Sequence, residues 1–320
     1  MTDKIPVYED IIKAHERILP FVHRTPVLSS TGINNIVGIH LYFKCENFQK
    51  VGAFKFRGAT HAVRQLTADE AKKGVTTHSS GNHAAALSLA ARQMNIPAYI
   101  VMPESAPAIK KKAVKGYGAE ITFCDSTLEA REKTLDIVQQ KTGATFIHPY
   151  HNFNVICGQG TAAKEFLEDY PDLDVIIAPV GGGGLISGTS IAAKAIKKGI
   201  KVFGAEPLNA DDAYRSFKQG KLIPALKPNT IADGLLTSLS PLTFQIIREN
   251  LDDILTVKEE TIVEAMRMIW ERMKIIVEPS SAVPLAAVIE NNRLFKGKKV
   301  GIIISGGNVD LDNLPFKLTH

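Results

Sequence analysis

Short apolar runs alternate with amphipathic segments along most of this chain. Between residues 70 and 148, runs of strand length are separated by segments whose apolar residues recur at helical spacing; the runs lie at 74–77, 98–102, 120–123 and 145–147. Strands that alternate with helices at short intervals are typical of a parallel sheet covered by helices. The pattern therefore predicts an α/β fold for this part of the chain.

The same alternation occurs outside residues 70–148. It predicts strands at 40–44, 175–180, 201–205 and 300–305, and helices at 6–19, 59–65, 161–169 and 259–273, with a loop over 148–160. Two blocks of this kind favour two doubly wound α/β lobes with a cleft between them. We expect residues 1–68 and 149–320 to form a large, cofactor-binding domain and residues 69–148 to form a small one.

Four consecutive glycines stand directly after the apolar run 175–180. These are Gly181, Gly182, Gly183 and Gly184, and a helix-like segment follows them. Glycines let backbone N–H groups approach an anion without interference from a Cβ atom, and the first amides of a helix attract negative charge. The stretch therefore predicts a phosphate site, although a flexible turn has the same composition.

A dinucleotide site is the first alternative for this loop, because Glu206 ends the next predicted strand where it could hold a ribose. However, Ser187 occupies the place that the third glycine of G-x-G-x-x-G requires. A Walker A loop is excluded, since no Lys-Ser or Lys-Thr follows the glycines. The sequence also lacks HExxH and G-x-S-x-G, so it gives no support to a catalytic metal or a serine hydrolase.

Composition narrows the function classes further. The chain has 320 residues, of which 45% are hydrophobic and 22% charged, and its net charge of +5 is too small to indicate nucleic-acid binding. The lysine runs 110–112 and 197–198 are interpreted as solvated helix faces. Neither a signal peptide nor a membrane-spanning run is evident, and Cys45, Cys124 and Cys157 lack metal spacing. We expect a soluble cytoplasmic protein with reduced thiols.

Lys55 is the strongest candidate for covalent chemistry. It lies in GAFKFRG among apolar residues and glycines, with Arg57 two positions on. A lysine in an apolar setting near another cation can have a lowered pKa and form a Schiff base. Taken alone, the segment favours a surface lysine before a helix, because the sequence does not show whether Lys55 is desolvated.

Four motifs together resolve that choice. GAFKFRG, HSSGNH, VGGGG and SGGN, in this order, resemble those of pyridoxal-phosphate (PLP) enzymes of fold type II, the tryptophan-synthase-β-like fold, and above all of the serine racemase and serine/threonine dehydratase family. The resemblance covers essentially the whole chain. It implies that Lys55 binds PLP and moves the α-proton, that Asn82 contacts the cofactor's 3-hydroxyl, that the four glycines hold its phosphate, and that Ser305 bonds its pyridine nitrogen.

The resemblance also implies a substrate site. The loop would bind the substrate carboxylate, through Ser79, Ser80, Asn82 and His83. Arg131 aligns with a substrate-side arginine, although a solvated helix arginine is an equal interpretation. Ser80 is the informative position, because racemases of the family have serine there and dehydratases commonly have alanine; it would be a second base opposite Lys55, unless it only binds carboxylate.

The implied activity is PLP-dependent serine racemisation combined with serine/threonine dehydration. Two departures, Ala53 in place of the usual serine and Tyr150 in place of the asparagine of animal racemases, keep an alternative open. That alternative is an L-threo-3-hydroxyaspartate or L-threonine dehydratase without significant racemisation. A nucleotide-binding protein without PLP is the alternative from a different class.

A divalent-cation site is implied in AEPLNADD. Glu206, Asp212 and the carbonyl of Ala210 could hold Mg²⁺, Ca²⁺ or Mn²⁺, whereas without the resemblance the two acids would be interpreted as surface residues. The expected partners are a small amino-acid substrate (serine, threonine or 3-hydroxyaspartate) and a second copy in a homodimer. An ATP effector is left open, and neither nucleic acid nor membrane is expected.

Overall fold

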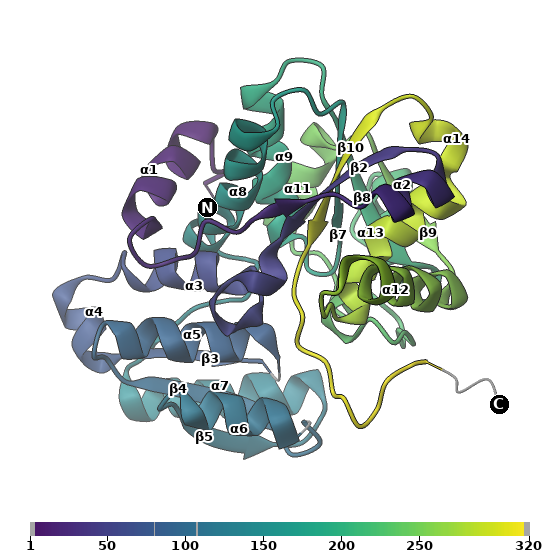
Figure 1. Cartoon of the computed structure of the whole chain (residues 1–320). Coiled ribbons are helices and arrows are strands. Elements are labelled where there is room, and N and C mark those ends of the chain that lie inside the picture. Colours follow the sequence, from purple (N-terminus) through teal and green to yellow (C-terminus); the bar gives the residue numbers. More distant parts are fainter. Residues whose placement is uncertain (1–3, 80, 107, 317–320) are drawn as a thin grey trace.

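Two sheets organise residues 4–79, 81–106 and 108–316, which the computed structural model describes (Figure 1). The larger has the strand order β1-β2-β10-β7-β8-β9 and the smaller β5-β4-β3-β6. The larger comprises β1 (Val27–Leu28), β2 (His40–Cys45), β7 (Val175–Pro179), β8 (Lys201–Pro207), β9 (Asp253–Val257) and β10 (Lys299–Ile304). The smaller comprises β3 (Val75–His78), β4 (Ala98–Pro103), β5 (Glu120–Cys124) and β6 (Thr145–Phe146).

Every strand pairing is parallel except that of β1 with β2. The α/β fold with parallel sheets is therefore confirmed. Strands of such sheets are buried on both faces, which explains their nearly continuous apolar runs. In β10, Ile302 and Ile304 pack into one core cluster and Ile303 into another, because successive side chains point to opposite faces.

Helices cover both sheets (Figure 1). Those before and within the smaller-sheet segment are α1 (Tyr8–Ile18), α2 (Thr31–Val37), α3 (Lys55–Val63), α4 (Ala68–Lys73), α5 (Asn82–Gln93), α6 (Ala108–Gly116) and α7 (Leu128–Thr142). Those that follow are α8 (Phe153–Asp169), α9 (Gly184–Ile196), α10 (Asp212–Gln219), α11 (Pro241–Asn250), α12 (Glu259–Met273), α13 (Pro279–Glu290) and α14 (Asn292–Phe295). Short 3₁₀ turns lie at η1 (Glu46–Phe48), η2 (Lys50–Gly52), η3 (Leu208–Ala210) and η4 (Asp233–Leu235).

Glycines bring three of these helices into close contact. A Cβ atom on Gly158 of α8 would lie 2.6 Å from Cα of Gly58 in α3, and one on Gly188 of α9 would lie 2.5 Å from the backbone nitrogen of Gly160. No side chain fits at such distances, so the helices can pack this closely only because these positions are glycine. Since α3 begins at Lys55 and α9 begins at the glycine loop, this packing fixes the two candidate cofactor segments relative to each other.

Two predicted boundaries were wrong. The expected loop over 148–160 ends earlier, because α8 begins at Phe153, where the side chain of Asn152 accepts a hydrogen bond from the backbone N–H of Val155 (3.0 Å). The glycines of this segment, Gly158 and Gly160, lie within α8 and allow it to pack closely on α3 and α9. The helix expected at 59–65 begins four residues sooner, at Lys55.

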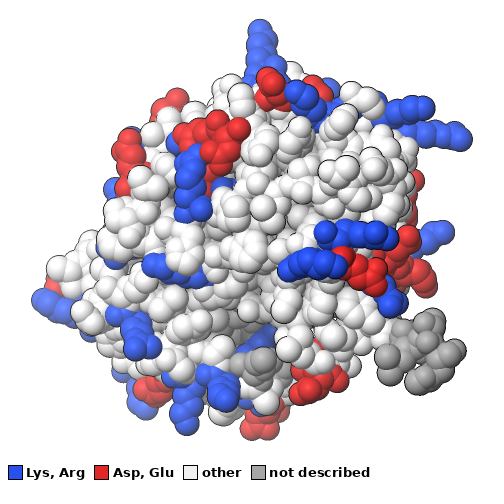
Figure 2. Space-filling view, viewed as in Figure 1, with Lys and Arg blue, Asp and Glu red and all other residues white. Residues whose placement is uncertain are grey.

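Neither the distribution of surface charge nor the cysteines indicate a particular function. Basic and acidic side chains are interspersed over the face seen in Figure 2. All three cysteines are free, and two of them are buried. Within the described part of the chain, no helix combines the length and apolar character that crossing a membrane requires.

Candidate active site

Lys55 lies where the chain passes the carboxyl end of β10. Ala53 forms an isolated bridge with Gly306, and the backbone N–H of Phe54 donates to the carbonyl of Ser305 (2.9 Å). The Lys55 ammonium donates to the carbonyl of Pro149 at 3.0 Å. Burial lowers the pKa of Lys55 to about 8, against the opposing effect of the Glu278 carboxylate. A sizeable fraction of a free amine with this pKa is neutral near pH 7.5.

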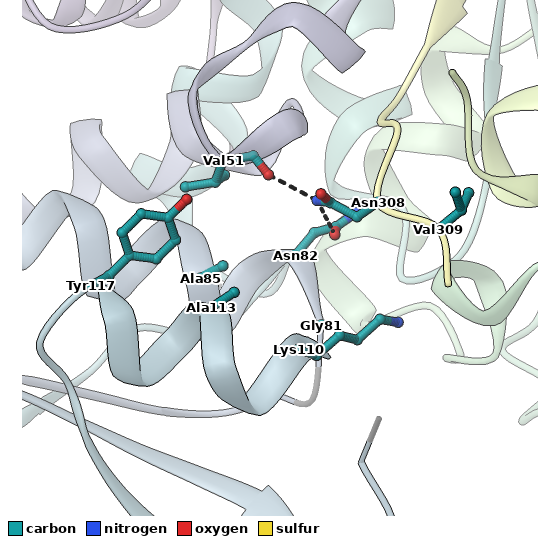
Figure 3. A pocket seen from close by; sticks show the side chains of 9 residues that line it. All are labelled: Val51, Gly81, Asn82, Ala85, Lys110, Ala113, Tyr117, Asn308 and Val309. Carbon is teal, nitrogen blue, oxygen red and sulfur yellow. Dashed lines mark hydrogen bonds between the residues drawn. The ribbon is translucent and has the colours of Figure 1, made fainter. Parts of the chain in front are cut away.

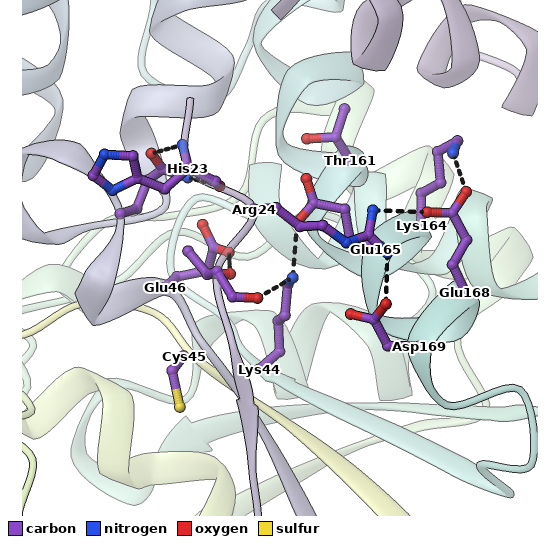
Figure 4. Close-up of polar contacts among 12 residues, drawn as sticks. His23, Arg24, Lys44, Cys45, Glu46, Thr161, Lys164, Glu165, Glu168 and Asp169 are labelled. Atoms are coloured by element: carbon purple, nitrogen blue, oxygen red, sulfur yellow. Dashed lines mark hydrogen bonds and ion pairs between the residues drawn. The ribbon is translucent and has the colours of Figure 1, made fainter. Parts of the chain in front are cut away.

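Arg57 does not cause that lowering. Its guanidinium is fully buried and donates to Glu46 (Nε to Oε2, 2.7 Å) and to Glu165 (Nη1 to Oε1, 2.8 Å), and Lys44 donates to the same Glu165 at 2.7 Å (Figure 4). Two cations face two carboxylates in this cluster, so the charge of Arg57 is compensated. Burial of Lys55, rather than a neighbouring cation, is therefore the source of its lowered pKa.

The glycine loop forms an open backbone cradle between β7 and α9, as the sequence predicted. Gly183 has φ of +86°, a conformation that favours glycine, and a Cβ atom on Gly182 would lie 2.2 Å from Cδ1 of Tyr150. The loop residues themselves have no side chains, so their N–H groups and the start of α9 can approach an anion without interference from a Cβ atom. These residues fit the phosphate of PLP.

Residues 148–151 connect the loop with Lys55. The carbonyl of Pro149 accepts from Lys55 while the ring of Tyr150 packs on Gly182. The segment is held by Nδ1 of His148, which accepts from the backbone N–H groups of Tyr150 (3.3 Å) and His151 (2.9 Å). The two strongest sequence candidates are therefore neighbours across one short turn.

The HSSGNH loop follows β3 and ends where α5 begins, at Asn82. Oγ of Ser79 accepts from the N–H of Gly81 (3.3 Å), whereas Ser80 lies outside the described residues. Nε2 of the buried His83 donates to the carbonyl of Ile147 (3.0 Å), and burial lowers the pKa of His83 to about 3. His83 is thus neutral and offers no positive charge to a substrate carboxylate, although its predicted role is not tested by this.

Ser305 is buried beside Lys55. Its hydroxyl is hydrogen-bonded to that of Ser281 in α13 (2.9 Å), which also donates to the carbonyl of Gly306 (2.7 Å). Ser281 has one hydroxyl hydrogen and gives it to Gly306, so Ser305 is the donor in the bond between the two hydroxyls. To contact an unprotonated pyridine nitrogen, the Ser305 hydroxyl would turn its hydrogen toward that nitrogen. The contact of Ser305 with the cofactor stays a prediction.

Glu278 is a buried acid in the site that the sequence analysis did not single out. Burial, with a smaller contribution from the charge of Asp233, raises the pKa of Glu278 to about 7. Both carboxylate oxygens accept from Nδ2 of Asn82, at 3.0 and 3.1 Å. Glu278 stands before a proline at the start of α13, where an acid is ordinarily a helix-capping residue. The only sequence signal was its place in IIVEP, a segment similar to the family.

Arg131 lies on α7. Its guanidinium donates to the carbonyls of Thr127 (3.3 Å) and Ser126 (3.2 Å), contacts that belong to its own helix start. A role toward substrate stays a prediction.

Glu206 and Asp212 are fully buried rather than on the surface. Glu206 accepts from the N–H groups of Ala213 (3.1 Å) and Tyr214 (2.9 Å), whereas neither oxygen of Asp212 has a hydrogen-bond partner of normal geometry among the described residues. Burial raises the pKa of Glu206 well above its usual value, with Asp212 adding to the effect, and burial raises that of Asp212 to about 6. A buried carboxylate without a partner fits a hard cation.

Comparisons with known proteins agree with this arrangement. Residues 18–306 match the family model described as "Pyridoxal-phosphate dependent enzyme". The chain is 53% identical to a serine racemase of Dictyostelium discoideum (96% of each chain covered) and 51% identical to a beta-hydroxyaspartate dehydratase of Paracoccus denitrificans (98% of this chain and 99% of the relative). The solved structure of maize serine racemase superposes with a TM-score of 0.94 at 48% identity, covering 97% of this chain and 95% of that one. By its sequence, its fold and the lysine beside its glycine loop, this chain belongs to the family of pyridoxal-phosphate dependent enzymes.

Proposed function

We propose that this enzyme interconverts L- and D-serine and also eliminates water from serine or threonine, releasing a 2-oxoacid and ammonia. The observation that carries the proposal is the position of Lys55, whose Nζ lies 3.0 Å from the carbonyl of Pro149 beside the glycine loop. The relative of Dictyostelium, at 53% identity over nearly the whole length, supports the choice of serine.

The residues that would hold PLP are Lys55, the backbone N–H groups of the glycine loop, Asn82 and Ser305. When bound, PLP withdraws electrons from the α-carbon of an amino acid and so acidifies its hydrogen. With a pKa of about 8, Lys55 can accept that proton at Nζ and return it. On the opposite face we assign the second proton carrier to Oγ of Ser80, on the family resemblance.

Elimination needs the same proton transfer plus loss of the β-hydroxyl. The α-hydrogen and the hydroxyl leave together as water, and hydrolysis of the resulting imine gives the 2-oxoacid and ammonia. A neutral Ser305 hydroxyl, rather than a carboxylate, at the pyridine nitrogen would keep that nitrogen unprotonated. That weakens carbanion stabilisation and favours prompt loss of the hydroxyl.

A second candidate is dehydration of L-threo-3-hydroxyaspartate with no significant racemisation. It is favoured by the relative of Paracoccus, which is a beta-hydroxyaspartate dehydratase at almost the same identity. Two positions keep this candidate open: Tyr150, which packs against the glycine loop, stands where animal racemases have asparagine, and Ala53, which bridges to Gly306, stands where most of the family has serine.

The deciding experiment incubates the PLP-loaded enzyme with Mg²⁺ and one substrate at a time: L-serine, L-threonine or L-threo-3-hydroxyaspartate. Release of 2-oxoacid and chiral amino-acid composition are followed together. D-serine together with pyruvate supports the racemase. Oxoacid alone, formed fastest from hydroxyaspartate, overturns it in favour of the dehydratase.

Two variants separate the assigned roles. Lys55→Ala should abolish both the visible absorbance of bound cofactor and turnover, and full turnover in this variant would contradict the proposal. Ser80→Ala should remove racemisation while sparing elimination of the L-isomer. An equal loss of both reactions would instead give Ser80 a carboxylate-binding role.

We further propose that Glu206, Asp212 and the carbonyl of Ala210 hold Mg²⁺ or a similar divalent cation. The two oxygens of the buried Asp212, which have no hydrogen-bond partner of normal geometry among the described residues, support this site. A homodimer, an ATP effector and a cytoplasmic location stay predictions, and gel filtration and nucleotide titration of the purified enzyme address the first two.

A further inference from the structure

The amide of Asn82 is held on both sides, by Glu278 and by Asn308. Figure 3 shows the side of Asn308. Its Nδ2 donates to both carboxylate oxygens of Glu278, at 3.0 and 3.1 Å, and its Oδ1 accepts from Nδ2 of Asn308 at 2.9 Å. The same nitrogen of Asn308 donates to the carbonyl of Val51 at 2.8 Å. These four residues come from the start of α5, the residue before α13, the segment after β10, and η2.

The chemistry of the outer partners fixes which way the amides point. A backbone carbonyl can only accept, so the end of Asn308 that faces Val51 must be its NH₂ group. An ionised carboxylate can only accept as well, so Asn82 turns its NH₂ group toward Glu278. The two oxygens of the Glu278 carboxylate lie close together, whereas the two hydrogens on the Asn82 amide nitrogen point in different directions. One hydrogen of Asn82 therefore bonds to both carboxylate oxygens.

One N–H of Asn82 is then left for a ligand. Asn308 takes one of the two acceptor positions of Oδ1, and the other N–H bond is directed to Glu278. The remaining N–H can meet only an acceptor, and it meets an ionised oxygen better than a neutral hydroxyl. Asn82 therefore presents a hydrogen-bond donor.

We infer that Glu278 is a positioning residue that fixes the amide of Asn82 as a donor toward the ionised 3-oxygen of the cofactor. The inference rests on the proposed function, since it takes PLP as the ligand. It assigns Glu278 a role through Asn82 and no proton transfer of its own.

The surroundings of Glu278 make its hydrogen bonds with Asn82 sensitive to pH. The side chain of Glu278 is buried. Three charged groups face it: Asp233 from η4, Lys110 from α6 and Lys55 from α3. The segment after β10 contributes only the uncharged residues Gly306 and Asn308 among the described residues. Lys110 is itself paired with Asp233. Burial raises the pKa of Glu278 to about 7. Below that pH the carboxyl gains a proton and can turn an O–H donor toward the N–H donor of Asn82.

The test measures PLP affinity and the visible absorption of the bound cofactor for wild type and Glu278→Gln, at about pH 6 and about pH 8. Glutamine keeps the shape but can accept at one position only, and it places an N–H against Asn82 at the other. At the higher pH we expect roughly tenfold weaker binding and a weaker absorption band of the ionised 3-oxygen. At the lower pH the difference should nearly vanish, because Glu278 is then mostly protonated in the wild type.

Comparing the two proteins at the same pH cancels the titration of Lys55 that they share. Because the Glu278 charge also raises the pKa of Lys55, the absorption band of the 3-oxygen, and not affinity alone, is the readout that reports on Asn82. The matched control, Glu260→Gln on the exposed first turn of α12, should behave as wild type. An unchanged affinity at both pH values, or the same loss at both, would overturn the inference, the latter because it would indicate a merely structural role.

If Glu278→Gln does not fold, Asn308→Ala replaces it. That variant frees Oδ1 of Asn82, so the amide can turn, and we expect about threefold weaker binding; undiminished affinity would count against the inference. Failure of the proposed function gives different results from failure of the inference about Glu278. If the proposed function is wrong, the wild type binds no PLP, or Lys55→Ala keeps the wild-type absorption band. The inference about Glu278 would fall with it.

Discussion

Replacing Glu165 with glutamine should destabilise the protein strongly. Glu165 is fully buried on α8 and accepts from Lys44 (2.7 Å) and from two nitrogens of Arg57 (2.8 Å each). Glu165→Gln would leave those two cations facing Glu46 as their one remaining carboxylate. Removing one partner of a buried ion pair costs about 3–5 kcal/mol, because the charge left behind stays desolvated.

The pKa of Glu165 gives a second route to the magnitude. Burial alone would raise it, but the charges of Arg57 and Lys44 outweigh burial and lower it from 4.5 to about 2. At about 1.4 kcal/mol for each pH unit between those values, the ionised carboxylate contributes about 3 kcal/mol. Because the folded-state pKa is below the unfolded one, this contribution is complete above pH 4.5 and is lost as the pH falls toward 2.

The assay is urea unfolding of the PLP-loaded enzyme at pH 7, with Glu168→Gln as the control. Glu168 lies on the same helix, but its side chain is 41% exposed and so is that of its partner Arg24, at 42%, whereas its other partner, Lys164, is mostly buried. An exposed pair contributes about 0–1 kcal/mol, so the control should lose little. Equal losses in the two variants, or a loss below about 1 kcal/mol for Glu165→Gln, would refute this reasoning.

The remaining predictions concern the ligand sites. Gly182→Ala should weaken PLP binding by about tenfold or more, because its Cβ atom would lie 2.2 Å from the Tyr150 ring; absorbance titration measures this, and a double variant with Tyr150→Ala should recover part of the loss. If the double variant recovers no PLP affinity, a clash with the Tyr150 ring is not the cause of the loss. Mg²⁺ should raise the melting temperature more at pH 7.5 than at pH 5.5, since protons compete for Asp212, whose pKa is raised to about 6. Asp212→Asn should abolish the increase, and an equal increase in wild type and variant would place the cation elsewhere.

The strand–loop–helix segment around the glycines could be predicted because its signal is local. An apolar run, four glycines and a helical pattern stand in sequence order, and β7 and α9 lie where that pattern placed them. The helix over residues 259–273 was predicted to the residue for the same reason, since its spacing and its acidic first turn agree.

What escaped prediction depends on contacts between distant residues. Glu278 is 196 positions from Asn82, and nothing in IIVEP indicates that its carboxylate meets that amide. Arg57 was taken as a neighbouring charge for Lys55, but its partners Glu46 and Glu165 come from η1 and α8. The loop predicted over 148–160 failed because glycine has two uses, loop flexibility and helix contact, and only the packing of Gly158 on Gly58 distinguishes them.

The order of strands in the larger sheet has a consequence for protein synthesis. β2 pairs with β10, which is made after the other strands of both sheets, and β10 also holds β7 on its other side. The smaller sheet, in contrast, is drawn from one continuous stretch of chain. During translation the smaller sheet can fold while the larger one still lacks a central strand. Because Ala53 and Phe54 are held by Gly306 and Ser305 just after β10, Lys55 reaches its final position only after β10 has been made. We therefore expect productive cofactor binding only after β10 has left the ribosome.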